Sequence, residues 1–155
     1  MRYDLIRPTS VIKRWEGGER IITTWAKYAG TVDFQATDFE AYKRVMPHSE
    51  YPSGSSCLFQ GSEEFVDGYL STIGLNPATF PVAIGPFPVG SSSVEPGMTP
   101  AAELTLQYGN MADLNQVGSE SRLDGGMHFD AAVPGGQIAC SGVAGYVLDG
   151  IFALI

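Results

Sequence analysis

Three separated stretches of this chain carry residue types that together bind a tetrahedral oxyanion. They are Arg7-Pro8, Pro52-Ser53-Gly54 and residues 121–128, which read S-R-L-D-G-G-M-H. Guanidinium groups clamp oxyanions through planar, bidentate hydrogen bonds, and a serine hydroxyl together with the N–H groups at a helix start adds further donors. One imidazole can then bond the central atom. This set predicts a pocket for phosphate or vanadate.

Each member of the set also has a more ordinary interpretation when it is taken alone. Arg7 and Arg122 would be surface or ion-paired residues, Ser53 a helix cap, and His128 a hydrogen-bonded histidine after a glycine turn. Their joint occurrence in one chain favours the binding site.

Two other kinds of site fit the sequence less well. The chain has only two histidines, His48 and His128, and no G-x-S-x-G elbow, so a Ser-His-Asp hydrolase is not favoured. Glu120, Asp124 and His128 would share one helical face as metal ligands. However, Gly125-Gly126 interrupts such a helix, and the set lacks the further histidine or thiolate usual in zinc sites.

The three stretches resemble the signature of the vanadium-dependent haloperoxidases and of the related type 2 phosphatidic acid phosphatases. That signature is Lys, six intervening residues and Arg-Pro; then Pro-Ser-Gly-His; then Ser-Arg, five residues and His. The matching positions here are Arg7-Pro8, Pro52-Ser53-Gly54, Ser121-Arg122 and His128.

The resemblance implies a role for each matching residue. Vanadate, or phosphate in the same pocket, would be held by Arg7, Ser53, Gly54 and Arg122. His128 would be the axial ligand of the vanadium, and in the phosphatases the same histidine is the nucleophile.

The sequence departs from the family signature at two positions. The family's lysine would fall one residue before Met1, and Ser55 stands where the family has its acid–base histidine. Serine cannot shuttle a proton near neutral pH, so the resemblance implies a weakened haloperoxidase. His48, in the loop before the second motif, is a candidate to supply the missing imidazole.

Three functions follow from this resemblance. The first is a haloperoxidase-like protein that oxidises halide with peroxide at bound vanadate, with the arginines neutralising the charge. The second is a degenerate, non-catalytic relative that acts as a structural or interaction subunit of a larger assembly. The third is an acid-phosphatase-like phosphoester hydrolase with His128 as its nucleophile.

The composition limits the fold and the partners. The chain has 155 residues, with 9 Lys+Arg against 17 Asp+Glu, and this acidic balance argues against a nucleic-acid partner. The 19 glycines and 10 prolines predict long ordered loops around a few helices, and the resemblance implies a mainly α fold. The resemblance implies that residues 1–155 are a single domain or a fragment, the C-terminal part of a haloperoxidase-like helical bundle. We therefore expect the chain to pack on another chain or on the N-terminal half of that bundle.

Hydrophobic periodicity and capping signals predict the elements that would position these residues. Helices are expected at residues 3–15, 55–71, 99–121 and 135–154, with one or two helical turns at 38–45. Weak strands are expected at 21–25 and 82–84, the second of them within a long loop at 74–100.

The compartment and the cysteine pairing stay open from the residues alone. The N-terminus has no apolar run long enough for a signal peptide, and the apolar tail at 143–155 is too short and carries Asp149, so no membrane span is expected. Cys57 and Cys140 each follow a motif stretch that converges in the family, which makes a bridge between them conceivable. Such a bridge would favour a secreted or luminal setting.

Overall fold

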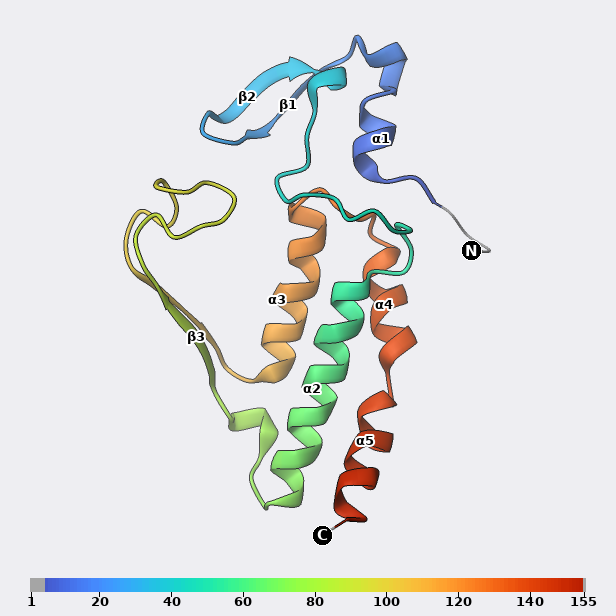
Figure 1. Ribbon diagram of the computed structural model, residues 1–155, viewed down its shortest axis with the longest axis vertical. Coiled ribbons are helices and arrows are strands. Elements are labelled where there is room, and N and C mark those ends of the chain that lie inside the picture. The colour runs from blue at the N-terminus through green and yellow to red at the C-terminus, as the bar shows by residue number, and fades with distance from the viewer. Residues whose placement is uncertain (1–4, 155) are drawn as a thin grey trace.

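The computed structural model describes residues 5–154 and shows a helical bundle with two β-hairpins attached (Figure 1). Helix α2 (Gly54–Thr72) lies at the centre of the bundle. It packs against α3 (Met111–Asp124), α4 (Ala132–Cys140) and α5 (Val143–Phe152). The mainly α fold predicted from the sequence is confirmed.

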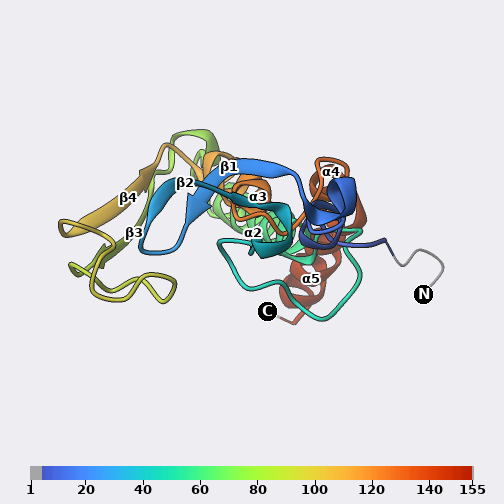
Figure 2. The same cartoon turned by 90° about the horizontal axis from the view of Figure 1, so that it is seen from above.

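The remaining elements are short. They are the helix α1 (Pro8–Ile12), the 3₁₀ turns η1 (Trp15–Gly18), η2 (Ala36–Asp38) and η3 (Pro77–Thr79), and the strands β1 (Ile21–Ala26), β2 (Gly30–Gln35), β3 (Val82–Phe87) and β4 (Leu104–Tyr108). Strands β1 and β2 form one antiparallel hairpin, and β3 and β4 form the other. Seen from above, β3–β4 stands to one side of the bundle (Figure 2).

Helix α2 matches the predicted helix at 55–71 to within a residue, because its start carries a strong local signal. Ser53 is the N-cap, and its Oγ accepts hydrogen bonds from the Ser56 N–H (3.3 Å) and the Ser56 hydroxyl (2.9 Å). The Ser53 N–H donates to the Ala132 carbonyl at 2.8 Å. A Cβ at Gly136 would lie 2.1 Å from the Ser53 carbonyl oxygen, so only glycine permits this approach. Helix α4 therefore fixes the N-terminus of α2.

The helix predicted at 99–121 is wrong in its first half. Leu104, Leu106 and Tyr108 recur every second residue, the period of a strand, and this segment pairs with β3. The helix begins only at Met111, after Asn110, whose side chain accepts the Asp113 N–H at 2.9 Å. This cap and the strand pairing outweigh the Thr-Pro start signal.

The helix predicted at 135–154 is two helices. Gly142 has a φ of 82°, the left-handed region, and its N–H donates to the Glu64 carboxylate at 2.8 Å. That contact separates α4 from α5 at a position where glycine is the favoured residue.

The helical turns predicted at 38–45 are also wrong. Only Ala36–Asp38 forms a 3₁₀ turn, and residues 39–50 cross the end of the bundle without a helix (Figure 1). The Lys43 N–H donates to the Gly125 carbonyl at 3.3 Å, so a tertiary bond replaces the helical one.

The expected strands and the long loop agree with the structure. The two predicted strands lie within β1 and β3, and η3 and β3 are the regular structure within residues 74–100. The helix predicted at 3–15 is too long, because only Pro8–Ile12 is α-helical and Arg7, the residue before the proline, is extended. Its first two residues, Tyr3 and Asp4, lie outside the described residues. Within residues 5–154 no helix is long and apolar enough to cross a membrane.

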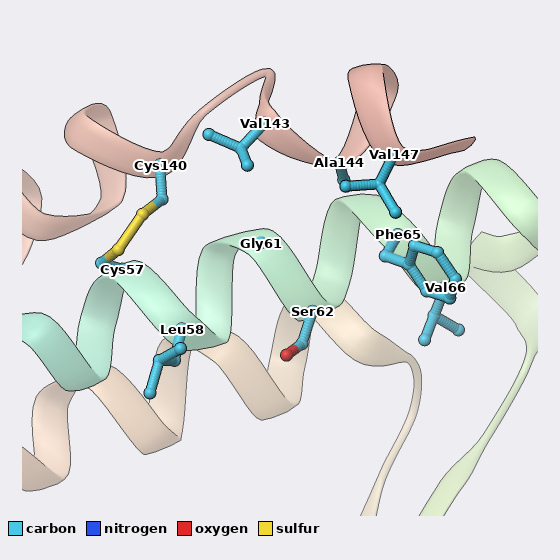
Figure 3. A pocket seen from close by; sticks show the side chains of 10 residues that line it. All are labelled: Cys57, Leu58, Gly61, Ser62, Phe65, Val66, Cys140, Val143, Ala144 and Val147. Carbon is cyan, nitrogen blue, oxygen red and sulfur yellow. A yellow bond between two sulfur atoms is a disulfide. The ribbon is translucent and has the colours of Figure 1, made fainter. Parts of the chain in front are cut away.

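A disulfide joins α2 to the end of α4 (Figure 3). Cys57 and Cys140 are 83 residues apart in sequence, and their Cα atoms are 5.1 Å apart. The pairing that the sequence left open is thus present. It links α2 to α4, the helix that also fixes the N-terminus of α2.

We predict that the double substitution Cys57→Ser and Cys140→Ser lowers the free energy of unfolding by about 2–5 kcal/mol, because the unfolded chain gains the entropy of an open loop. Urea unfolding of the oxidised protein and of the variant measures this difference. The unsubstituted protein, with its disulfide reduced by excess reductant, is the matched control and should lose a similar amount of unfolding free energy. Equal stability of all three forms would contradict the prediction.

Candidate functional site

A cavity of about 400 Å³ at the N-terminal end of α2 gathers most of the predicted site residues. Its lining consists of Arg7, Lys43, Arg44, Met46, His48, Gly54, Ser55, Leu58, Arg122, Met127 and His128. Of the predicted residues only Ser53 is missing from this lining. Ser53 is fully buried and serves as the N-cap of α2.

Arg7 is buried and ties together two other segments that line the cavity. Its Nη1 donates to the Met127 carbonyl at 2.9 Å and lies 3.3 Å from His128 Nε2. Its Nη2 donates to the carbonyls of His48 (2.9 Å) and Ser49 (3.0 Å). Burial lowers the pKa of Arg7, and the Glu50 carboxylate acts in the opposite direction. The guanidinium keeps its charge, and its Nε–H is buried without a partner among the described residues.

His128 is held in one tautomer. Its Nδ1–H donates to the Glu50 carbonyl at 2.7 Å, which leaves the Nε2 lone pair toward Arg7. The Glu50 carboxylate lies 3.3 Å from Nδ1 and accepts the Phe129 N–H at 2.8 Å. Burial and then the charge of Arg7 lower the pKa of His128, against the opposing effect of Glu50. The imidazole is therefore neutral at pH 7, and Nε2 can act as a ligand or as a nucleophile.

Arg122 brings a second guanidinium to the cavity from the last turn of α3. Its Nη2 and Nε donate to the Ser121 Oγ at 2.8 and 3.2 Å. It is half-buried, and burial lowers its pKa. Within residues 5–154 no carboxylate forms a salt bridge with it. A partly desolvated cation without an anionic partner is a favourable place for an anion.

Lys43 and Arg44 also line the cavity, and reasoning from the sequence missed them. The signal that could have found them is a basic pair shortly before Pro52 in an otherwise acidic chain. With Arg7 and Arg122 they make four of the nine Lys and Arg residues. None of the four forms a salt bridge with a carboxylate of the described residues. Positive charge is thus concentrated at one cavity of a chain whose net charge is −8.

The start of α2 adds backbone donors to these cations. Gly54 is exposed, and no described group accepts a hydrogen bond from the N–H of Gly54 or Ser55. The positive end of the helix dipole lies at the same place. Cations, free N–H groups and a neutral imidazole form a donor set that fits a tetrahedral oxyanion.

His48 and Ser55 lie where acid–base chemistry would be needed. Both line the cavity, and His48 is exposed. His48 Nδ1 lies 3.1 Å from Arg7 Nη2. Nδ1 also lies 3.0 Å from the Ser49 carbonyl, which can only accept. The two contacts therefore hold the ring in place but do not fix which nitrogen carries the proton.

The alternative metal site is not assembled. In the part of the chain that the structure describes, no three His, Cys, Asp or Glu side chains are grouped to hold a metal ion. His128 instead pairs with Glu50, on a different segment from Glu120 and Asp124.

A second cavity, of about 410 Å³, lies between α2 and the α4–α5 pair (Figure 3). Its lining consists of Cys57, Leu58, Gly61, Ser62, Phe65, Val66, Cys140, Val143, Ala144 and Val147. No charged side chain lines it, so it offers packing surface and no acid–base or anion chemistry.

Comparisons with known proteins agree with the fold. The family model described as "VCPO second helical-bundle domain" matches residues 1–155. A crystal structure of a holo-type bacterial vanadium-dependent chloroperoxidase is 30% identical, with a TM-score of 0.80, over 93% of this chain and 29% of that chain. The apo-type structure of a bacterial vanadium-dependent chloroperoxidase is also 30% identical, with a TM-score of 0.79, over 93% and 30%. No curated protein matches the chain.

We predict that Glu50→Gln lowers the pKa of His128 further below its usual value. The carboxylate favours the protonated imidazole, and glutamine keeps an oxygen for the Phe129 N–H while removing the charge. NMR titration of the two histidine rings measures the shift directly. Glu103→Gln, an exposed acid on another segment, is the control and should leave His128 unchanged. A His128 pKa that stays constant in Glu50→Gln would contradict the assignment.

Proposed function

Because this chain belongs to the family of the VCPO second helical-bundle domain, we propose that its basic cavity binds vanadate and that the protein oxidises halide with peroxide there. The chain spans about 30% of the length of the solved chloroperoxidase chains that it matches. The observation that carries the proposal is the cavity itself. The guanidinium groups of Arg7 and Arg122, which have no carboxylate partner among the described residues, meet one neutral, oriented imidazole at a helix N-terminus.

The residues have distinct roles in this proposal. Arg7 and Arg122 neutralise the negative charge of the oxyanion, and the N–H groups of Gly54 and Ser55 donate to its oxygens. His128 Nε2 would bind the vanadium. In the structure Arg7 donates to backbone carbonyls, and these hydrogen bonds hold the guanidinium in place. Its positive charge would attract the oxyanion through space. When bound, vanadate would supply a Lewis-acid centre for peroxide.

His48 is the proposed proton carrier of this site. Ser55 occupies the position of the family's acid–base histidine and cannot carry a proton near neutral pH. His48 lines the same cavity, and the contacts of its Nδ1 with Arg7 Nη2 and the Ser49 carbonyl hold the imidazole there.

The rest of the family's fold is the proposed partner of the bundle. The surface accessible to solvent is 9873 Å², whereas a compact chain of this mass exposes about 7,600 Å². Ile138, Tyr146 and Leu154 are 76%, 83% and 86% exposed. Apolar side chains this exposed are expected where a helix packs on a neighbouring domain or chain.

We further propose that the protein resides in an oxidising compartment, and the Cys57–Cys140 disulfide supports this.

Vanadate binding tests the proposal. We predict micromolar binding in calorimetry, lost in His128→Ala because the imidazole that would bind the vanadium is removed, and retained in His48→Ala, the matched histidine control. Binding should also weaken as the pH falls through the lowered pKa of His128, since only neutral Nε2 can ligate. Absence of binding to the unsubstituted protein would mean a degenerate, non-catalytic relative.

His48→Gln tests the proton carrier separately. We predict that it lowers bromide oxidation by roughly a hundredfold or more, the usual effect of losing a general acid or base, while vanadate affinity changes little. Monochlorodimedone bromination measures the rate, and calorimetry measures the affinity. A variant with an unchanged rate would exclude His48 from proton transfer.

Steady hydrolysis of a phosphate monoester without bromide oxidation would favour the phosphatase alternative, in which His128 Nε2 attacks phosphorus.

A further inference from the structure

The oxyanion cavity has more room and more positive charge than one tetrahedral anion needs. Its volume of about 400 Å³ lies in the range of sites that take small organic ligands. Arg7, Arg122 and His128 supply the set expected around one oxyanion. Lys43 and Arg44 are two further cations on the same lining, and no acidic side chain accompanies them.

The segment that carries these two cations is held in place at both ends. On one side, the Tyr42 hydroxyl donates to the buried Glu95 carboxylate at 2.8 Å, and the Tyr28 N–H donates to the same carboxylate at 2.9 Å. The Lys43 N–H donates to the Gly125 carbonyl. On the other side, Arg7 holds the His48 carbonyl. Two cations on an anchored segment lose less conformational freedom when they bind an anion than they would on a free loop.

The charged ends of Lys43 and Arg44 are available for a ligand. Both residues are exposed, and within residues 5–154 neither side chain donates a hydrogen bond or forms a salt bridge. Their segment crosses the C-terminal end of α3, where the Lys43 Cβ packs beside Gly125. Arg122 reaches the cavity from within the last turn of that helix, and His128 from the loop that follows it.

We propose that Lys43 and Arg44 form a second anion subsite beside the oxyanion subsite of Arg7, Arg122 and His128. The inference rests on the proposed function, because it assumes that the cavity binds an oxyanion. The ligand of the second subsite is an additional negative group. It is either a second charged group on the same ligand or a separate small anion, and the two experiments below distinguish these sources.

The first experiment compares inorganic phosphate with pyrophosphate, whose two linked phosphoryl groups can span both subsites. Calorimetry on the intact protein measures both affinities. We expect pyrophosphate to bind about tenfold more tightly, and we expect Lys43→Gln with Arg44→Gln to remove that advantage while phosphate affinity stays within about threefold. Lys13→Gln with Arg14→Gln is the matched control: it removes an identical Lys-Arg pair outside the cavity and should change neither affinity.

The second experiment detects a separate small anion. The line width of the bromide NMR signal is measured with the phosphate-bound protein and the same variants. Broadening that is lost only in the Lys43 and Arg44 variant would identify a separate anion, and a pyrophosphate advantage lost only in that variant would identify a second group on one ligand. Either result supports the subsite.

Three outcomes would overturn the inference. The first is that neither measurement depends on Lys43 and Arg44. The second is that their loss weakens phosphate as much as pyrophosphate, which would make them part of the single oxyanion subsite. The third is an equal effect of the Lys13 and Arg14 control. Absence of phosphate binding to the unsubstituted protein would instead overturn the proposed function itself.

Discussion

The buried guanidinium of Arg7 is the constraint on which the rest of the site depends. A charge removed from water must be met by well-placed acceptors, and Arg7 meets the carbonyls of His48, Ser49 and Met127. These carbonyls belong to two segments that are far from Arg7 and from each other in sequence. Satisfying one cation therefore brings the loop before α2 and the loop after α3 to the same place. The carbonyls orient the charge without neutralising it as a carboxylate would.

A second constraint fixes the N-terminal end of α2, which lines the cavity. This end is held against α4, because Gly136 lets the Ser53 carbonyl approach closely and the Ala132 carbonyl accepts a hydrogen bond from the Ser53 N–H. The disulfide joins the same two helices one turn further along α2. The free N–H groups of α2 are thereby kept at a fixed position relative to the cations. The contacts that pack α2 on α4 therefore also position the donors of the site. A substitution in α4 would shift these donors although α4 itself contributes no residue to the cavity lining.

Glu50 controls both the tautomer and the protonation of His128. Its carbonyl selects the tautomer of His128, and its carboxylate favours the protonated ring, while burial and Arg7 favour the neutral one. The latter effects prevail, so the imidazole is neutral and its Nε2 lone pair faces Arg7 Nη1 at 3.3 Å. A buried carboxylate beside a buried cation and an imidazole also limits the net charge that the folded chain must bury.

The sequence alone determined the chemical inventory and the elements with strong local signals. The two arginines, His128 and the capped start of α2 were visible because motif spacing, a serine N-cap and a 3.6-residue period act within a few residues. It did not determine β4, the break at Gly142 or the path of residues 39–50, because pairing with β3 and contacts with Glu64 and Gly125 decided these. Only the tertiary structure placed Lys43, Arg44 and Glu50 at the site. Their positions depend on hydrogen bonds between residues tens of positions apart, and no local pattern encodes such contacts.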